Sequence, residues 1–252
     1  MSPFIVASIS FVCVLGAALV GMVIGPKLPA HHLESNSKDV VRLSMGMIAT
    51  MTALVLGLVT GSAKSAFDAE DSAVKSIAAS LLSFDRMLAD YGPQTKEVRS
   101  LVQGLVAAKI ARAWPEDGSA SAVGPPSTSN PSQMIISQIL KLTPQNDQQQ
   151  WYKSQALEAG GSILQARWIV FSGVQNSVPT LFLVVMVCWL TLLFGSFGLF
   201  APRNATVVVA LVMCSLSVAA SIFLILEMND PFNGVMKISS DAMRYVASHL
   251  NQ

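Results

Sequence analysis

The chain has 252 residues, of which 52% are hydrophobic and 12% are charged, and its mean hydropathy is +0.53. Soluble globular domains carry about 25% charged residues, so this composition excludes an ordinary soluble domain. The formal net charge of +1 excludes the basic excess that favours a nucleic-acid partner. The composition therefore indicates a membrane protein whose main partner is the lipid bilayer.

Four uncharged apolar runs, arranged in two pairs, account for this composition. They are residues 4–25, 43–63, 178–201 and 205–226. A helix needs about 20 apolar residues to cross a bilayer core of roughly 30 Å. We therefore predict an all-α, polytopic membrane protein with four transmembrane helices in two hairpins. The first run lacks a preceding basic segment and exceeds the apolar core of a signal peptide, so we predict a true span.

Helices are also predicted between the two pairs, where they form an extramembrane stalk. A short polar loop, residues 27–42, is expected to lead into the second span. The second span continues without a proline until Pro93, and its apolar residues recur at steps of three and four to about residue 90. Further helices are predicted over residues 94–114, 132–142, from 148 onward and 239–250. A flexible loop is expected over residues 116–131 and a break or kink at residues 177–179, because these stretches carry Pro, Gly or Ser. The predicted domains are residues 1–63, 64–177, 178–227 and 228–252.

The end of the fourth span carries a recognisable string. LILEMNDPFNG, followed by VMKISSDAMRYV, resembles the C-terminal signature of the bestrophin-like family of bacterial and plant membrane proteins, usually labelled a domain of unknown function. The matching residues are Glu227, Asp230, Pro231, Phe232 and Gly234. The stretch over residues 57–93 resembles the family's long helix after span two, and QARWIVF resembles its Arg-bearing helix before span three. The resemblance implies distant kinship with bestrophins, which are pentameric anion channels.

Small residues share one face of the second span. Gly57 and Gly61 form a GxxxG pair, and small residues let helices approach closely in lipid. One interpretation is helix packing; the other is a narrow pore face. Both can hold in an oligomer. The predicted pore-lining residues are Thr50, Ala53, Gly57, Thr60, Gly61 and Lys64.

Charged residues continue this face beyond the span. Asp68, Asp71 and Lys75 follow Lys64 at helical spacing, and in an oligomer they could form charged rings at a pore mouth. The alternative is a set of i,i+4 salt bridges on a solvated helix face.

The segment after span four has two interpretations as well. Ionisable residues near membrane depth suggest function, and Arg167 or Arg244 could pair with Glu227 or Asp230. However, Asp, Pro and Gly in this order also make an ordinary turn. We predict a structural elbow formed by Glu227, Asp230, Pro231, Phe232 and Gly234. It docks the last helix through Met243, Tyr245, Val246 and Leu250.

No catalytic constellation is present. The sequence has no nucleophile elbow, HExxH, P-loop or GxGxxG motif, and Cys13, Cys188 and Cys214 fit neither a disulfide framework nor a metal site. We therefore expect no enzyme, no cofactor and no metal, including at His31, His32 and His249.

The leading hypothesis is a homo-oligomeric ion channel of four or five subunits, with span two lining the axis. The alternative is a non-transporting membrane scaffold whose stalk binds a partner. The expected location is the cell membrane, as a multi-pass protein of a bacterial inner membrane. Short-loop cations favour the short loops inside, whereas bestrophin kinship favours the helical segment inside, so orientation stays open.

Overall fold

The computed structural model describes residues 2–27, 29, 35–115, 131–175 and 180–251. These described residues form α-helices and two short 3-10 helices, with no β-strand among them. The predicted all-α fold is therefore confirmed. The chain divides into two compact units: residues 1–65 with 178–229, and residues 66–177 with 230–252.

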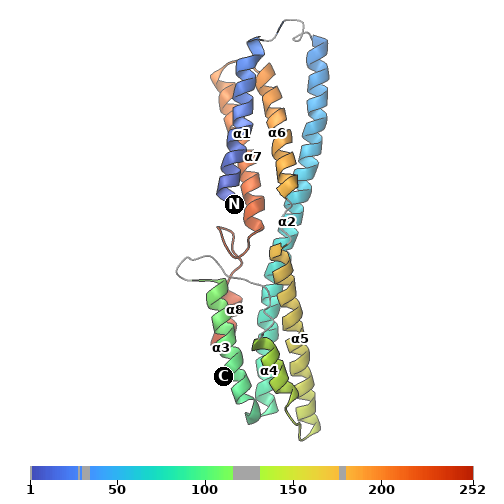
Figure 1. The fold of residues 1–252 in the computed structure, drawn as a ribbon, viewed down its shortest axis with the longest axis vertical. Coiled ribbons are helices and arrows are strands. Elements are labelled where there is room, and N and C mark those ends of the chain that lie inside the picture. Colours follow the sequence, from blue (N-terminus) through green and yellow to red (C-terminus); the bar gives the residue numbers. More distant parts are fainter. Residues whose placement is uncertain (1, 28, 30–34, 116–130, 176–179, 252) are drawn as a thin grey trace. The chain divides into compact units, whose positions relative to one another are not determined.

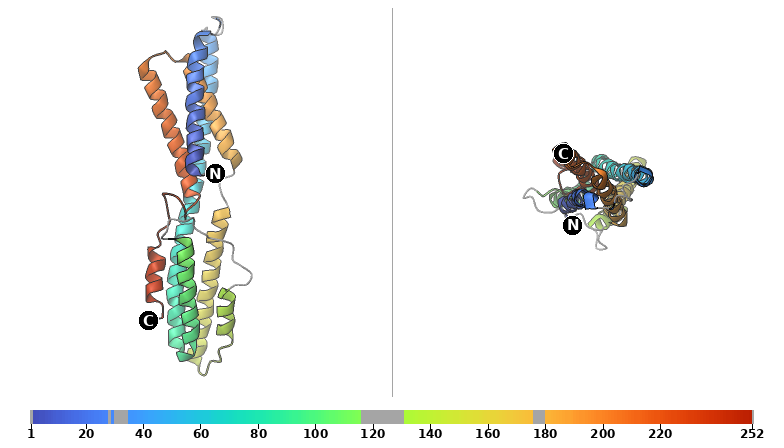
Figure 2. Two further views of the ribbon diagram at one scale, coloured as in Figure 1. Left: turned by 60° about the vertical axis from the view of Figure 1, so that its left-hand side comes forward. Right: turned by 90° about the horizontal axis from the view of Figure 1, so that it is seen from above.

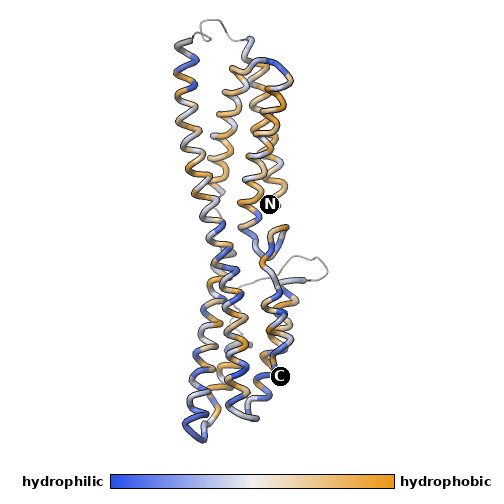
Figure 3. The backbone as a smooth tube through the Cα atoms, turned by 180° about the vertical axis from the view of Figure 1, so that it is seen from behind, coloured by the Kyte–Doolittle hydropathy of each residue, from blue (hydrophilic) through white to orange (hydrophobic). Residues whose placement is uncertain are grey.

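The first unit contains the apolar helices. Its members are α1 (Pro3–Ile24), α6 (Thr180–Phe200), α7 (Ala205–Met228) and the first part of α2 (Ser35–Tyr91). Helix α1 lies beside α6 and α7 (Figure 1). Each of the four helices is long and apolar enough to cross a membrane, and hydrophobic residues dominate them (Figure 3). These helices coincide with the four predicted spans.

Close packing of small residues in this unit occurs between α1 and α6. A Cβ on Gly21 would lie 2.9 Å from the Leu199 backbone nitrogen and would collide with the Gly195 carbonyl oxygen. A Cβ on Gly198 would collide with the carbonyl oxygen of Ala18. Helices associate in lipid mainly through such close approach, so these glycines fix the α1–α6 contact.

The short connection between α6 and α7 is held by side-chain hydrogen bonds. Asn204 caps α7, because its Oδ1 accepts the Val207 N–H at 2.9 Å. The Arg203 guanidinium donates to the carbonyl oxygens of Met22, at 2.8 and 3.0 Å, and of Val23, at 3.1 Å. The last carbonyls of a helix lack intrahelical donors, so Arg203 satisfies the C-terminal end of α1.

Helix α2 runs without interruption for 57 residues. It begins at Ser35, so the prediction of a loop up to residue 42 is wrong. The polar residues there mark the end of the apolar run. They do not mark the end of the helix, because a helix can continue through polar residues. Helix α2 stops at Tyr91 because Gly92 adopts a φ of 131° and Pro93 follows.

The second unit is a bundle of amphipathic helices around its own core. It contains the rest of α2 with α3 (Lys96–Ala113), α4 (Pro131–Leu140), α5 (Asp147–Gln175) and α8 (Asp241–His249). Buried side chains from these helices, among them Leu88, Val102, Ile139, Ala156 and Val246, form one cluster. Helix α8 lies beside α3 (Figure 2).

Helix α8 docks with three of the four predicted residues. Met243, Val246 and Leu250 are buried. Tyr245 is 59% exposed, and its ring stacks on His249 at a centroid distance of 4.2 Å, so its predicted docking role is wrong. The buried residues are spaced by three and four and share a helix face, whereas Tyr245 projects from the other side.

Two predicted connections fall mostly outside the described residues. These are the kink at residues 177–179 and the loop up to residue 130. Pro131, predicted as the last loop residue, instead begins α4, a position that suits proline because the first helical N–H has no intrahelical acceptor.

Candidate functional site

The predicted pore-lining residues all lie on the exposed surface of α2 in this single chain. They are Thr50, Ala53, Gly57, Thr60, Gly61 and Lys64. The Thr50 hydroxyl donates to the Met47 carbonyl oxygen at 2.8 Å, and that of Thr60 to Leu56 at 2.7 Å. Each threonine oxygen therefore retains lone pairs that can accept from water or coordinate an ion.

Helix α2 presents three different faces in the first unit. The packing face contacts the core of this unit through Met45, Ile48, Ala49, Thr52 and Leu56. The six predicted pore-lining residues form a second face, here called the small-residue stripe. Because successive residues of a helix are about 100° apart, this stripe lies about 100° around the helix from the packing face. A third stripe, about 200° around, consists of large apolar residues that are 54–76% exposed: Leu43, Met47, Met51, Leu54 and Leu58. The large apolar side chains suit contact with lipid, whereas the small-residue stripe consists of glycine, alanine, threonine and one lysine.

The GxxxG pair of α2 makes no close packing with the part of the chain that the structure describes. A Cβ built on Gly57 or on Gly61 would meet no described atom within 4 Å. The glycines of the α1–α6 contact have no such room. Intrachain packing therefore does not account for small residues on this stripe.

The charged continuation of the stripe is partly paired along the helix. Lys75 Nζ lies 2.6 Å from Asp71 Oδ2, and their side chains are 65% and 28% exposed. This pair is one of the i,i+4 salt bridges predicted as the alternative to charged rings at a pore mouth. Pairs of this kind on a helix surface contribute about 0.3–0.5 kcal/mol to stability. Lys64 and Asp68 are exposed on the same stripe.

The predicted elbow follows the end of α7. Glu227, 4% exposed, lies in the last turn of α7. The Asn233 backbone N–H donates to the Asp230 carbonyl oxygen at 3.2 Å, and its side-chain amide donates to Asp230 Oδ1 at 3.0 Å. Gly234 has a φ of 88°, a left-handed conformation that glycine adopts without steric penalty.

The apolar residues of the elbow are anchored in the second unit. Pro231 is fully buried, and its carbonyl oxygen accepts the Ile238 N–H at 2.9 Å. Phe232 packs edge-on against Trp114 at a centroid distance of 5.6 Å. The Trp114 indole N–H donates to the Ile238 carbonyl oxygen at 2.8 Å. These contacts fix where the chain enters α8.

Glu70 is a buried carboxyl group that the sequence prediction missed. It lies on α2 beyond the apolar run that ends at Ala63, it is 4% exposed, and its Oε2 has no hydrogen-bond partner among the described residues. Burial, together with the negative charge of Asp230, raises the pKa of Glu70 to about 7. The only sequence signal was its place on the buried side of the helix, in line with Ala63 and Val74.

A buried ion pair in the second unit was also missed. The Arg99 guanidinium donates to both carboxylate oxygens of Asp85 at 2.8 Å, and the two side chains are 11% and 8% exposed. Asp85 Oδ2 also accepts the Asn251 backbone N–H at 3.1 Å. The pair therefore joins α2, α3 and the residues after α8.

Metal ligands do not gather anywhere in the described part of the chain: no three His, Cys, Asp or Glu residues are close enough to share an ion. His31 and His32 lie outside the described residues. Cys13, Cys188 and Cys214 are free thiols on exposed positions.

Comparisons with known proteins show the family and the fold of this chain. The family model of the Bestrophin-like domain matches residues 12–243. The chain belongs to the Bestrophin-like family. The family resemblance that the Asp-Pro-Phe-Asn-Gly string suggested is therefore confirmed. No curated protein sequence matches the chain.

The Bestrophin-like fold is supported by a solved structure as well. The crystal structure of a bacterial bestrophin homologue from Klebsiella pneumoniae, which carries one substitution, has a TM-score of 0.68 to this chain. The match covers 96% of this chain and 98% of that one, at 10% sequence identity. At this identity the similarity shows the fold alone.

Proposed function

We propose that this Bestrophin-like protein is a homo-oligomeric ion channel of the cell membrane in which α2 lines the central axis. The observation that carries this proposal is the small-residue stripe of α2. It is exposed, it differs from the neighbouring large apolar stripe, and its glycines have no partner in the described chain. A stripe of small and hydroxyl-bearing residues suits a water-filled axis, where bulky side chains would close the path.

The charges that follow Lys64 support the same arrangement. Repetition around an axis would turn each exposed charge of the stripe into a ring, which is how channels commonly bias ion sign. The Asp71–Lys75 pair partly neutralises this segment, so we assign no ion preference to it. The family membership is consistent with four or five subunits in a bacterial inner membrane.

The oligomer is tested first. Mass measurement of the purified protein in lipid nanodiscs should give a closed assembly of four or five chains. A monodisperse monomer would exclude an axial pore, because one chain cannot enclose the stripe.

The axial position of α2 is tested with Gly57→Leu. The matched control is Gly16→Leu on α1, because a Cβ at Gly16 also meets no described atom within 4 Å. In planar bilayers, Gly57→Leu should block the current or prevent assembly, and Gly16→Leu should leave both unchanged. If Gly57→Leu leaves the current and the mass of the assembly unchanged, α2 does not line the axis.

The scaffold alternative predicts a different result. An assembly of the expected mass that conducts neither cations nor anions would favour a non-transporting scaffold that binds a partner through its amphipathic helices.

A further inference from the structure

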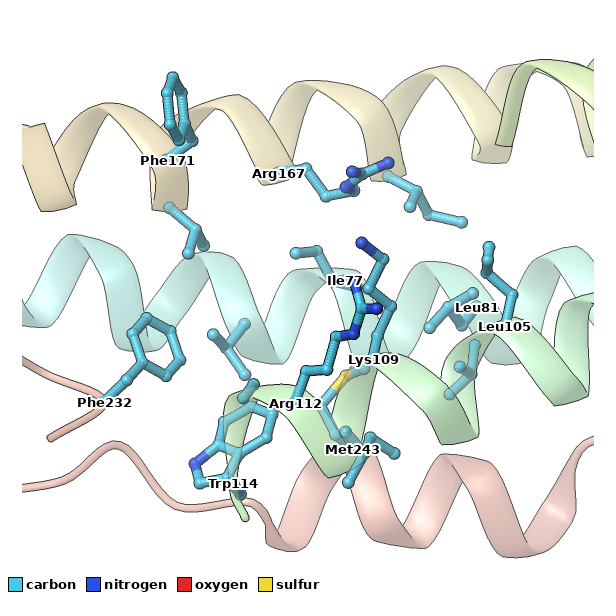
Figure 4. A pocket seen from close by; sticks show the side chains of 16 residues that line it. Ile77, Leu81, Leu105, Lys109, Arg112, Trp114, Arg167, Phe171, Phe232 and Met243 are labelled. Carbon is cyan, nitrogen blue, oxygen red and sulfur yellow. The ribbon is translucent and has the colours of Figure 1, made fainter. Parts of the chain in front are cut away.

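A cavity of about 190 Å³ opens on the second unit, between α2, α3, α5 and α8 (Figure 4). Sixteen side chains line it, and all are apolar except three. The three are cationic: Lys109, Arg112 and Arg167. No carboxylate is among the described residues that line it.

The apolar wall is held in a fixed position. The Trp114 indole uses its N–H on the Ile238 carbonyl oxygen and packs against Phe232. The ring therefore has no polar atom left to satisfy, and it offers only carbon surface to the cavity. Leu81 and Met243 continue this surface and are buried.

The cations stand close enough to repel one another. Lys109 extends from α3 toward α5, which carries Arg167, and Arg112 lies beside it (Figure 4). Partial loss of hydration lowers the pKa of Lys109, and the charges of Arg167 and Arg112 lower it further. Burial also lowers the pKa of Arg167. Lys109 and Arg112 are exposed, whereas Arg167 is half-buried, so the charge lies at the rim of an apolar hollow.

We propose that this cavity binds a small anionic amphiphile, a carboxylate with a chain of about eight carbons such as a medium-chain fatty acid. The carboxylate would lie between Lys109, Arg112 and Arg167, where it would relieve their repulsion, and the alkyl chain would fill the apolar hollow. The volume fits such a ligand, because an apolar cavity of ~150 Å³ already accepts benzene. Charge-assisted hydrogen bonds from several donors are the usual means of holding a carboxylate.

The experiment is equilibrium dialysis of labelled octanoate against the full-length protein in nanodiscs of zwitterionic lipid, with empty nanodiscs as the background. We expect saturable binding of one octanoate per chain. Unlabelled octanoate should compete, whereas octanol, which lacks the charge, and acetate, which lacks the chain, should compete at least about tenfold less well, the scale of one charge-assisted contact.

Three variants and one control locate the site. Lys109→Met should weaken binding about tenfold by removing one charged donor, and Lys109→Arg should retain it. Lys96→Met is the matched control on the same helix, because Lys96 is exposed and does not line the cavity. Leu105→Trp, which adds bulk to the apolar wall, should abolish binding while the thermal stability stays unchanged.

Several results would overturn the proposal. One is uptake equal to that of empty nanodiscs, as expected if a second copy of the chain covers the cavity. Another is saturable binding that Lys109→Met and Leu105→Trp both leave intact, which would place the ligand elsewhere. Equal competition by octanol would remove the role of the cations.

Discussion

Replacing Glu70 with glutamine should change how stability depends on pH. The folded-state pKa of Glu70 is about 7, against an ordinary value of 4.5, because the carboxyl is buried beside Asp230. Below about pH 4.5 the group is protonated in both the folded and the unfolded chain. Between pH 4.5 and 7 the folded chain binds more protons than the unfolded chain, so stability falls as pH rises through this window.

The size of this effect follows from the two pKa values. A tenfold difference in a protonation equilibrium corresponds to about 1.4 kcal/mol. The free energy of unfolding therefore falls by about 3 kcal/mol between pH 4.5 and a pH above 7. Glutamine carries no charge at either pH, so Glu70→Gln removes this loss. For chains of this size, 1 kcal/mol shifts Tm by about 2–4 °C, which predicts a relative gain of about 6–12 °C.

The assay is the Tm of detergent-solubilised protein near pH 4.5 and near pH 8, compared between wild type and variant. The matched control is Glu97→Gln on α3, because Glu97 is exposed. The Tm of Glu70→Gln relative to wild type should rise with pH, while that of Glu97→Gln should stay constant. A Tm difference between Glu70→Gln and wild type that is the same at both pH values would refute a proton held at Glu70.

Three further predictions test the packing through the effect of substitutions on Tm. Asp85→Asn should destabilise the protein by about 3–5 kcal/mol, because it leaves a buried arginine without its carboxylate; a change under about 1 kcal/mol would contradict this. Gly198→Val should be strongly destabilising because its side chain would meet the α1 backbone, whereas Gly16→Val, with open space around it, should be mild; equal effects would be inconsistent with the close contact. Gly234→Val should lower Tm by more than Asp230→Asn, since it forces a β-branched residue to a φ of 88°; the reverse order would favour a functional Asp230.

Helical periodicity was sufficient to predict the helices, but it misplaced the start of α2 and, by one residue, the start of α4. Apolar runs long enough to span a bilayer leave the backbone few alternatives to a helix, so α1, α6 and α7 were predictable from local sequence. The start of α2 at Ser35 was not, because residues 35–42 are mostly polar. Polar residues show where a helix leaves an apolar environment, but they do not show where the helix begins or ends.

The residues considered as candidate functional groups divide in a similar way. The small stripe of α2 is a property of one helix, so its residues could be named from spacing alone. The Asp85–Arg99 pair and the cluster of Lys109, Arg112 and Arg167 join helices that are distant in sequence. No local pattern marks which side chains such helices bring together.

The sequence by itself determined the class of the protein, its spans and its family, because these depend on hydropathy, helical period and one turn motif. Only the tertiary structure decided which glycines pack: a Cβ on Gly21 or Gly198 would meet backbone atoms, whereas one on Gly57 or Gly61 would meet none among the described residues. It also decided that Glu70 is buried and Tyr245 is not. The physical reason is that burial and close approach depend on which helix faces which, and helical period fixes the faces of one helix without fixing their partners.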